Sequence, residues 1–469
     1  MPACLLLSLV TLAQDPTELA QEPQDGASEE ELWDEGLEDL LGGVPSGELG
    51  SLEEGGGLRI ASLRGSVGSR YRYFFRDRDT GLNDQQWFFE GDLELDLDIN
   101  ESWSGFVQPR FRLDLYDSEL RRFEPFEAYL NWRGESSDLR LGQMVENWGI
   151  ADTYNPLDVL NRRDFASDFL DPDRLGEMGL RYRMHFPSGE VLGEPTLALY
   201  LIPVFRRTEF PTASSRYSLG AGPIPFREQG SITPDGEDQI FGAVRALSTL
   251  DTSVFNADFH LLAARGPEPF PTLMPRFKPN FTVDVVPVYY GGTTLGAGLR
   301  AVPDEQTLGS FLSEFTFKFE GAYKQLYKFP ESPISAPEDY FTYVVGLDRV
   351  LDRPFGEKDQ LTLTLEYAGE NGASDPTSQL RFFRSDGVLR LFWEANNFSR
   401  TSLEARWIQD LDTGERIVQV IFESQLRFLH EDLRFWLDYQ VFHLEPGEPS
   451  LLNFFPNGSS ITTGIFLDF

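Results

Sequence analysis

From Leu58 to the last residue, apolar and polar residues alternate in short segments that turn-forming residues separate. In the clearest segment, residues 89–99, the odd positions are apolar apart from one glycine and the even positions are all acidic. The acidic row consists of Glu90, Asp92, Glu94, Asp96 and Asp98. A period of two is typical of a β-strand with one apolar and one wet face. A barrel in a membrane supplies both environments, lipid outside and an aqueous lumen inside.

The same alternation recurs in later segments of the chain. Apolar residues occupy nearly every second position over residues 311–323, 361–367, 433–441 and 461–469. No run of about 18 apolar residues occurs, which excludes a membrane-spanning helix and leaves a closed barrel as the structure that satisfies every backbone group inside lipid. The pattern therefore predicts an all-β fold, a transmembrane antiparallel up-and-down β-barrel covering residues 58–469.

Loop lengths indicate the number of strands and their direction, because outer-membrane barrels have short periplasmic turns and long outer loops. On this basis the ring closes with about 18 strands if residues 281–302 form one long strand bulged at Gly291–Gly292, or with about 16 if two weak segments fail. Short turns are expected at residues 249–251, 396–399 and 430–432, and long outer segments at 207–237, 265–279, 326–338, 370–386 and 444–459. An even count places both ends of the barrel chain in the periplasm.

The last segment ends in Phe469 and has Ile461, Thr463, Ile465 and Leu467 on the same face. A terminal aromatic residue after such alternation resembles the C-terminal signal that the barrel-assembly machinery reads in outer-membrane barrels. We therefore expect the last strand to descend and Phe469 to face lipid at the periplasmic rim. The expected location is the bacterial outer membrane, with lipid as the barrel's surroundings.

The chain before the barrel has a different composition. Residues 1–13 are typical of a signal peptide, with the apolar run Leu5–Leu12 and the small residues Thr11 and Ala13 before a cleavage site, although no Lys or Arg precedes the run. Residues 14–57 contain 14 acidic residues, and the first basic residue of the chain is Arg59. This composition predicts a mostly disordered periplasmic segment.

One part of the acidic segment has a helical pattern. Residues 28–43 begin with a capping box of Ser28 and Glu31, end at Gly42, and place apolar side chains on one helical face. That face consists of Leu32, Trp33, Leu37, Leu40 and Leu41. A helix this short is marginal alone in water, so it would dock on the barrel or on a periplasmic partner, or remain a solvated linker.

Composition and charge narrow the possible functions. The mean hydropathy of −0.31 resembles that of a soluble protein, but only alternate residues of a barrel strand face lipid. The formal net charge of −36 argues against a nucleic-acid partner, because no basic face is available to neutralise phosphates. The one cysteine, Cys4, lies in the predicted signal peptide. Residues 77–84 resemble a calcium-binding loop in their acidic residues but lack the glycine and the final glutamate of an EF-hand loop. We therefore expect no metal and no cofactor.

A long segment, Glu146–Leu175, follows the predicted fifth strand and would be the third outer loop. The third loop of general porins folds into the lumen and narrows it, and the position favours the same here by analogy; a surface loop is the alternative. Trp148, Tyr154 and Phe165 would anchor the loop. Its polar candidates for a constriction are Asp152, Asn155, Asp158, Arg162, Arg163, Asp164, Asp171, Asp173 and Arg174. Opposed acidic and basic rows there would orient polar solutes.

Other lumen-facing candidates lie on the predicted strands. Besides the acidic row at 90–98, they are Arg110, Arg112, Glu127, Arg140, Glu314, Lys318, Glu366, Arg390, Arg406, Arg434 and Asp438. The acidic row predicts a preference for cations, and the mixed rows elsewhere would help polar or amphiphilic solutes to pass.

Residues 140–164, RLGQMVENWGIADTYNPLDVLNRRD, resemble a "GRQ…WG…NP.D" segment in a large, mostly uncharacterised family of porin-like bacterial outer-membrane barrels, some encoded beside RND-type (MMPL-like) exporters. The matching positions are Gly142, Trp148, Gly149, Asn155, Pro156, Asp158 and Asp164. The sequence departs at Gln143, where the family often has arginine. The close resemblance covers about 25 residues and implies an outer-membrane channel or export component without a known substrate.

The sequence thus predicts an outer-membrane channel, narrowed by residues 146–175, for small polar or amphiphilic solutes. The alternative is a component of an export or lipid-transport system that docks periplasmic partners through the 28–43 helix. An enzyme is the third possibility. The four histidines, His185, His260, His430 and His443, lie in no recognisable nucleophile motif, and GxSxG is absent, so we expect no catalytic activity. The oligomeric state is left open.

Overall fold

The computed structural model describes residues 58–75, 83–117, 120–166, 168, 170–212, 215–217, 219, 226–278, 281–330, 332, 335–372, 383–444 and 458–469. The chain divides into two units, Met1–Leu58 and Arg59–Phe469, and the strands of the described residues lie in the second unit. The predicted signal peptide, the acidic segment and the 28–43 helix lie outside the described residues.

Eighteen strands form the main sheet. In chain order they are β1 (Arg59–Phe74), β2 (Gln85–Asp98), β3 (Trp103–Asp114), β4 (Arg122–Arg133), β5 (Ser137–Met144), β8 (Glu177–His185), β9 (Leu192–Ile202), β10 (Phe241–Asp251), β11 (Phe255–Pro267), β14 (Gly291–Pro303), β15 (Phe315–Tyr327), β16 (Tyr340–Asp352), β17 (Gln360–Asn371), β18 (Ser385–Glu394), β19 (Ser402–Asp410), β20 (Arg416–Gln425), β21 (Leu433–His443) and β22 (Ser460–Asp468).

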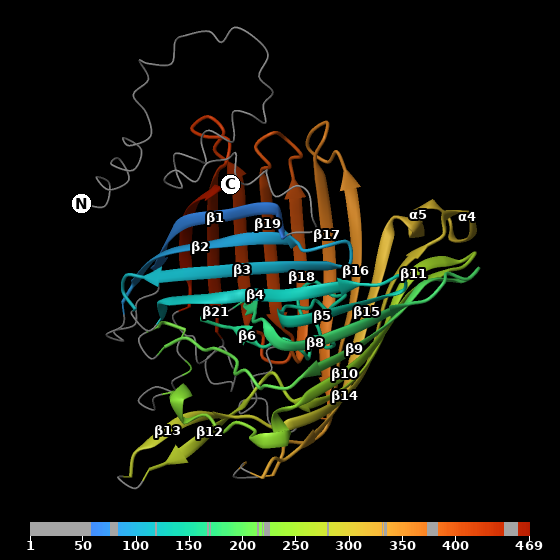
Figure 1. The fold of residues 1–469 in the computed structure, drawn as a ribbon. Coiled ribbons are helices and arrows are strands. Elements are labelled where there is room, and N and C mark those ends of the chain that lie inside the picture. The colour runs from blue at the N-terminus through green and yellow to red at the C-terminus, as the bar shows by residue number, and fades with distance from the viewer. Residues whose placement is uncertain are drawn as a thin grey trace. The chain divides into compact units, whose positions relative to one another are not determined.

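Each of these strands pairs antiparallel with the next along the chain, and the last strand pairs with the first. Figure 1 shows the strands side by side around the ring. Because β1 and β22 pair over nine residues, Ser66–Phe74 with Ser460–Asp468, the sheet has no open edge at this seam. The predicted up-and-down barrel and its count of about 18 strands are confirmed.

Two short hairpins lie in the long loops at one end of the barrel, which we call the outer end. One is β6 (Arg163–Asp164) with β7 (Asp173–Arg174), and the other is β12 (Thr272–Phe277) with β13 (Val283–Val288). The prediction of a single strand over 281–302 is therefore wrong. Residues 283–288 leave the barrel and pair with β12, and the wall strand β14 begins at Gly291. Residues 283–288 and the start of β14 both have strand-like sequences, which is why the sequence predicts a single strand there.

The opposite end, which we call the periplasmic end, has the shorter connections. The turn predicted at 249–251 is displaced, since β10 continues to Asp251 and the turn covers residues 252–254. The strand predicted over 311–323 begins only at Phe315. Phe311 lies instead in α5 (Ser310–Ser313), which follows α4 (Glu305–Leu308) in the β14–β15 turn. Two 3₁₀ turns, η2 (Glu228–Gly230) and η3 (Gly236–Gln239), lie in the β9–β10 loop. Among the described residues, no helix is long and apolar enough to cross a membrane.

The two faces of the wall separate as the alternation predicts. On β15, the Phe317 side chain is 43% exposed, whereas Lys318 and Glu320 on either side of Phe319 are buried. Exposed apolar side chains on the outside and polar side chains on the inside are what a barrel in lipid requires. The exterior therefore fits a membrane, and the charged interior is the lumen.

Phe469 lies at the seam of the barrel. Its backbone N–H donates to the carbonyl oxygen of Gly65, and Gly65 N–H donates back to Phe469 O at 2.8 Å. A Cβ atom at position 65 would be 2.7 Å from the Phe469 ring, so the ring needs a glycine beneath it. The last residue thus pairs with β1 at the periplasmic end, on the outward face.

Candidate functional site

The segment between β5 and β8, residues 145–176, runs inside the barrel; we call it the inner loop. Its first part contacts β15, where the Glu320 carboxylate accepts the backbone N–H groups of Ile150 at 2.7 Å, Ala151 at 3.3 Å and Leu157 at 2.7 Å. Glu320 is fully buried. A buried carboxylate is stabilised by several N–H donors aimed at it, so this group holds the loop backbone against the wall.

A second interior carboxylate extends this attachment to β17. Glu366 accepts the backbone N–H groups of Asp152 at 2.8 Å and Thr153 at 3.1 Å. The Asp152 side chain forms an ion pair with Lys318 of β15 and lies 4.0 Å from Arg390 of β18. The segment 150–157 is therefore bound to the wall through both its backbone and its side chains.

Glycines on β14 make room for this docking. A Cβ atom at Gly298 would lie 2.5 Å from the Cδ1 atom of Ile150, and one at Gly296 would overlap the Leu157 side chain. Any larger residue on this part of the wall would displace the loop. Nearby, Trp148, Leu157 and Leu160 belong to a buried cluster with interior residues of β9, β10, β11 and β15.

The second part of the inner loop contacts the opposite wall. Asp164 forms an ion pair with Arg122 of β4 at 2.9 Å, and Asp173 pairs with Arg110 of β3 at 3.3 Å. Asp171, whose side chain is 72% exposed, lies 3.6 Å from Arg406 of β19, which is on the same side of the ring as β17. In the ring of eighteen strands, β4 and β17 hold the fourth and thirteenth positions, so they face each other across the lumen. The loop therefore reaches from one wall to the other between Asp152 and Asp164.

Burial alters the acid–base behaviour of these loop carboxylates. Desolvation raises the pKa of Asp164, although Arg122 opposes this shift. Desolvation likewise raises the pKa of Asp173 against the opposing effect of Arg110. Asp164, whose side chain is 9% exposed, is thus held where water reaches poorly, and its ion pair is less screened than a pair on an open surface, whereas the side chain of Asp173 is 53% exposed and its pair meets more water.

The predicted constriction residues fall into two groups. Asp158 and Arg162, whose side chains are each 1% exposed, are buried where the loop packs against the wall. Asp158 binds Arg163 and Arg174, both at 2.6 Å, and Arg162 donates to the carbonyl oxygens of Leu160 and Pro267. These residues shape the loop. Among the predicted constriction acids, Asp152, Asp164, Asp171 and Asp173 form ion pairs with residues of the wall.

Other positions in the motif also serve the loop's own structure. The side chain of Asn155 lies against Gly149, and a Cβ atom at position 149 would overlap it. Tyr154 stacks on Phe383 at 5.3 Å, and the buried Trp148 packs edge-on against Tyr200 at 4.8 Å. The Trp–Gly–Asn–Pro sequence is thus explained by packing within the loop and against the wall.

The acidic row on β2 faces arginines on both neighbouring strands. Glu90 contacts Arg70 of β1 at 2.6 Å and Arg112 of β3 at 3.6 Å. Arg64 of β1 contacts Glu94 at 3.2 Å and Asp96 at 3.7 Å. Asp92 accepts hydrogen bonds from Ser66 and Gln108, and Asp98 pairs with Arg59. Because guanidinium groups compensate most of the row, it exerts a weaker pull on cations than an isolated acidic row would.

Several remaining wall candidates are paired with their neighbours. Glu127 accepts the N–H of Val145 at 2.8 Å, where the inner loop begins. Arg140 contacts Glu146 at 3.6 Å, and Arg434 pairs with Asp468 at 3.1 Å. Asp438 accepts hydrogen bonds from Gln419 and Gln440. Glu314 was predicted on a strand but lies in the turn before β15, where it pairs with Arg349. Arg390 donates to Glu404 at 2.9 Å, and Arg406 contacts the same carboxylate.

A second packed region lies among interior residues near the outer ends of the strands. It joins Phe165 of the inner loop to Phe210 and Tyr217 of the β9–β10 loop and to wall residues that include Phe74 and Phe442. The Tyr217 hydroxyl is 3.2 Å from the carbonyl oxygen of Gly458 and 3.3 Å from Ser460. Desolvation raises the pKa of Tyr217 to about 12. We call this group the outer core.

The structure also places the histidines. His185 lies 3.0 Å from Asp138, and His260 lies 3.0 Å from Arg245, both on barrel strands. His430 lies in the β20–β21 turn near Asp432. In the described part of the chain, no group of three His, Cys, Asp or Glu residues is arranged to hold a metal ion. The predicted docking residues of the 28–43 helix lie outside the described residues and stay a prediction.

Sequence reasoning missed several residues that hold the loop. Glu320, Gly296 and Gly298 were not among the candidates, and neither were Arg122 and Tyr217. Glu320 did carry a signal, since it is an acid at an interior position of a clearly alternating strand. The glycines and Arg122 had none, because their role depends on which distant segment lies against them.

No protein-family model matches the chain, and no curated protein matches its sequence. Among solved structures, it is similar to OccK11 (OpdR) of Pseudomonas aeruginosa, at 11% identity over 87% of this chain and 95% of that chain, with a TM-score of 0.44. It is also similar to OmpF of Salmonella typhi in complex with daunomycin, at 11% identity over 88% and 97% of the two chains, with a TM-score of 0.39. A mutant porin of Rh. blastica is 11% identical over 87% and 99%, with a TM-score of 0.37.

These likenesses concern the fold, and the fold itself is established by the strand pairings. A closed ring of eighteen antiparallel strands with an apolar exterior and a charged interior is a bacterial outer-membrane β-barrel of the porin type. The resemblance of residues 140–164 to an exporter-associated family, and any periplasmic partner, stay predictions.

Proposed function

We propose that the protein is a narrow outer-membrane channel for small polar solutes and that the inner loop reduces the cross-section of its lumen. The attachment of the loop to opposite walls carries this proposal: Glu366 on β17 holds Asp152, and Arg122 on β4 holds Asp164. A loop that runs from wall to wall leaves less space for solutes than the ring alone provides.

The charges around the loop bear on selectivity. The side chains of Asp171 and Asp173 are more than half exposed, and arginines face them from β19 and β3. The β2 acids are also matched by arginines of β1 and β3. We therefore propose weak selectivity between small cations and anions, in place of the strong cation preference that the β2 row alone predicts.

Conductance in a planar bilayer tests the channel. We expect a small unitary conductance and, across a KCl gradient, a reversal potential near zero. Swelling of liposomes in sugars and amino acids of increasing size should show a sharp upper size limit. A large conductance would contradict the narrowing, and the absence of both current and swelling would contradict the channel.

The double variant Asp171→Asn, Asp173→Asn measures how much the loop charges contribute to ion selectivity. It should move the reversal potential towards anion preference, because two exposed carboxylates are removed while their arginines remain. The matched control is Asp158→Asn, a buried loop acid that faces Arg163 and Arg174. An unchanged reversal potential in the double variant would show that solutes do not pass these residues.

A further inference from the structure

Large apolar side chains project from four consecutive periplasmic turns on one side of the barrel. They are Phe311 in the β14–β15 turn, Phe355 in the β16–β17 turn, Phe398 in the β18–β19 turn and Phe428 in the β20–β21 turn, and each is at least 66% exposed. The periplasmic turns β2–β3, residues 99–102, and β4–β5, residues 134–136, carry no comparably exposed large apolar side chain. The wall therefore has an aromatic periplasmic rim on one side.

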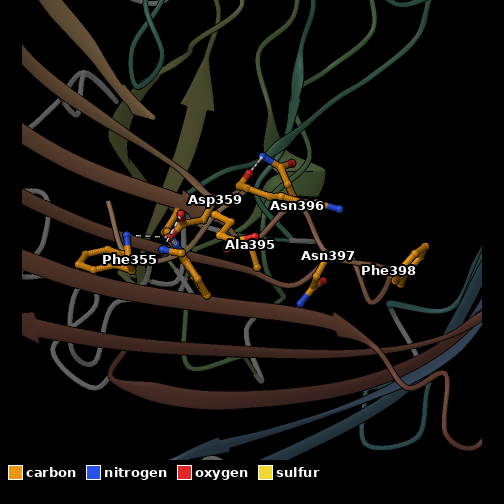
Figure 2. A pocket seen from close by; sticks show the side chains of 10 residues that line it. Phe355, Asp359, Ala395, Asn396, Asn397 and Phe398 are labelled. Carbon is orange, nitrogen blue, oxygen red and sulfur yellow. Dashed lines mark hydrogen bonds between the residues drawn. The ribbon is translucent and has the colours of Figure 1, made fainter. Parts of the chain in front are cut away.

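A pocket of about 560 Å³ lies between two of these turns, with residues 355–359 on one side and residues 395–398 on the other. Figure 2 shows Phe355 and Phe398 at the two ends of the labelled group, with Asp359 and Asn396 between them. The volume of the pocket is within the range of about 300–1,000 Å³ that is usual for small-molecule sites.

Hydrogen bonds within the first turn, and from that turn to β18 and to the second turn, fix the pocket. Asp359 accepts the backbone N–H groups of Phe355 at 3.0 Å and Gly356 at 2.8 Å and the indole N–H of Trp393 at 3.0 Å. Asn396 donates to the carbonyl oxygen of Lys358 at 3.0 Å. Because three donors compensate the Asp359 carboxylate, the charged side chains left to meet a ligand are Glu357 and Lys358, which both line the pocket and are exposed.

The pocket borders the lipid-facing side of the wall through Trp393, one of its lining residues. Trp393 is a direct strand neighbour of Leu361 and of Leu403, and Leu403 belongs to the exposed apolar exterior. Phe355 packs edge-on against Trp393, with 6.5 Å between ring centroids. The pocket is thus continuous with the membrane-facing surface and lies where the strands end, at the level of lipid headgroups.

We propose that this pocket binds the headgroup of a zwitterionic glycerophospholipid of the periplasmic leaflet, of the phosphoethanolamine kind. Lys358 binds the phosphate and Glu357 binds the ammonium group, while Phe355 and Phe398 flank the glycerol and Trp393 contacts the start of an acyl chain. The adjacent opposite charges match a dipolar headgroup better than a headgroup with net negative charge, which Glu357 repels. The proposal does not depend on whether the barrel conducts.

The test measures lipids that stay bound to the full-length protein. The protein is reconstituted with equal amounts of phosphatidylethanolamine and phosphatidylglycerol, extracted in mild detergent, and analysed by native mass spectrometry. We expect the wild-type protein to retain phosphatidylethanolamine in excess. Lys358→Glu should reduce the retained amount about tenfold, as one lost charge-assisted hydrogen bond does. Glu357→Lys should shift retention towards phosphatidylglycerol.

Phe428→Ser is the matched control, because Phe428 is equally exposed on the next turn and does not line the pocket. It should leave lipid retention unchanged, whereas Phe355→Ser combined with Phe398→Ser should abolish it. Equal retention of the two lipids by the wild-type protein, or an unaltered preference in Glu357→Lys, would overturn the proposal. So would a periplasmic protein that occupies the pocket in place of lipid. Unfolding temperatures check that each variant is folded.

Discussion

The Oε1 atom of Glu320 accepts the backbone N–H of Leu157 at 2.7 Å, although 163 positions separate the two residues. The other oxygen of the same carboxylate accepts the N–H groups of Ile150 and Ala151. One wall side chain therefore holds both ends of the segment 150–157. If the inner loop narrows the lumen, this carboxylate is the point at which the narrowing can be removed.

Replacing Glu320 by alanine should release the first part of the loop. Three buried N–H groups lose their acceptor, and each unsatisfied donor costs about 1–3 kcal/mol. We expect a larger unitary conductance, faster proteolysis within residues 150–157 and a lower unfolding temperature. Glu320→Gln keeps one acceptor oxygen and should have an intermediate effect.

Glu314→Ala provides the control for Glu320. Glu314 immediately precedes β15, its side chain is 48% exposed, and its ion pair is with Arg349. Such a surface pair contributes about 0–1 kcal/mol. If the conductance of Glu320→Ala equals that of Glu314→Ala, the loop does not depend on this carboxylate.

The glycines of β14 should be equally sensitive. Gly298→Val adds atoms where Ile150 already lies, and overpacking of this kind costs about 1–3 kcal/mol. The loop should then lift from the wall, which bilayer conductance and unfolding temperature would both report. Adding Ile150→Ala should restore both values.

Gly387→Ala tests whether any barrel glycine has this effect. The Cβ atom there would be 3.8 Å from Leu411, an ordinary contact, so no change is expected. A loss of stability as large as that of Gly298→Val would indicate a general effect on the strands.

The barrel could be predicted from the sequence because each wall strand repeats the same physical requirement. Glu90 and Asp92 must face water while Phe89 and Leu93 face lipid, and this alternation is visible without a structure. The interpretation of 281–302 failed where alternation continues outside the wall. Nothing in the local pattern shows that Val283–Val288 pairs with the hairpin strand β12 while Gly291 begins a wall strand.

The position of the inner loop was suggested by analogy, but its attachments could not be predicted. Asp158 and Arg162 looked like constriction residues because they are charged and lie in a long loop. Both charges are buried and compensated, since Asp158 binds Arg163 and Arg174 within the loop, and Arg162 lies 3.8 Å from Glu177 of β8 and donates to two carbonyl oxygens. Which charges turn inward depends on the loop's conformation, and that conformation depends on Glu320 and Glu366, far along the chain.

The pair of Arg122 and Asp164 should stabilise the second part of the loop. Removing Arg122 should cost about 3–5 kcal/mol, because the buried Asp164 carboxylate loses its guanidinium partner, as does Glu209 beside it. Arg122→Ala alone should therefore be more destabilising than Arg122→Ala with Asp164→Asn. A double-mutant cycle of chemical unfolding measures the coupling, which we expect to be about 1–3 kcal/mol.

Asp171→Asn is the comparison for that cycle, since Asp171 is mostly exposed and lies 3.6 Å from Arg406. Its loss should cost no more than about 1 kcal/mol and less at high salt. Additive effects of the Arg122 and Asp164 changes would mean that the two charges do not act as a pair.

Tyr217 should reveal how far the outer core closes the barrel. Tyr217→Phe removes a hydroxyl group near Gly458 and Ser460 and keeps the edge-on contact with Phe74 at 5.5 Å. That loss should cost about 1 kcal/mol and leave conductance unchanged.

Tyr217→Ala also removes the ring, which costs about 3–5 kcal/mol for a buried aromatic side chain. If the outer core obstructs the path of solutes, conductance and the size limit in liposome swelling should both rise in Tyr217→Ala alone. If they do not rise although the protein is measurably less stable, solutes pass beside the outer core, and the inner loop sets the narrowest part of the path.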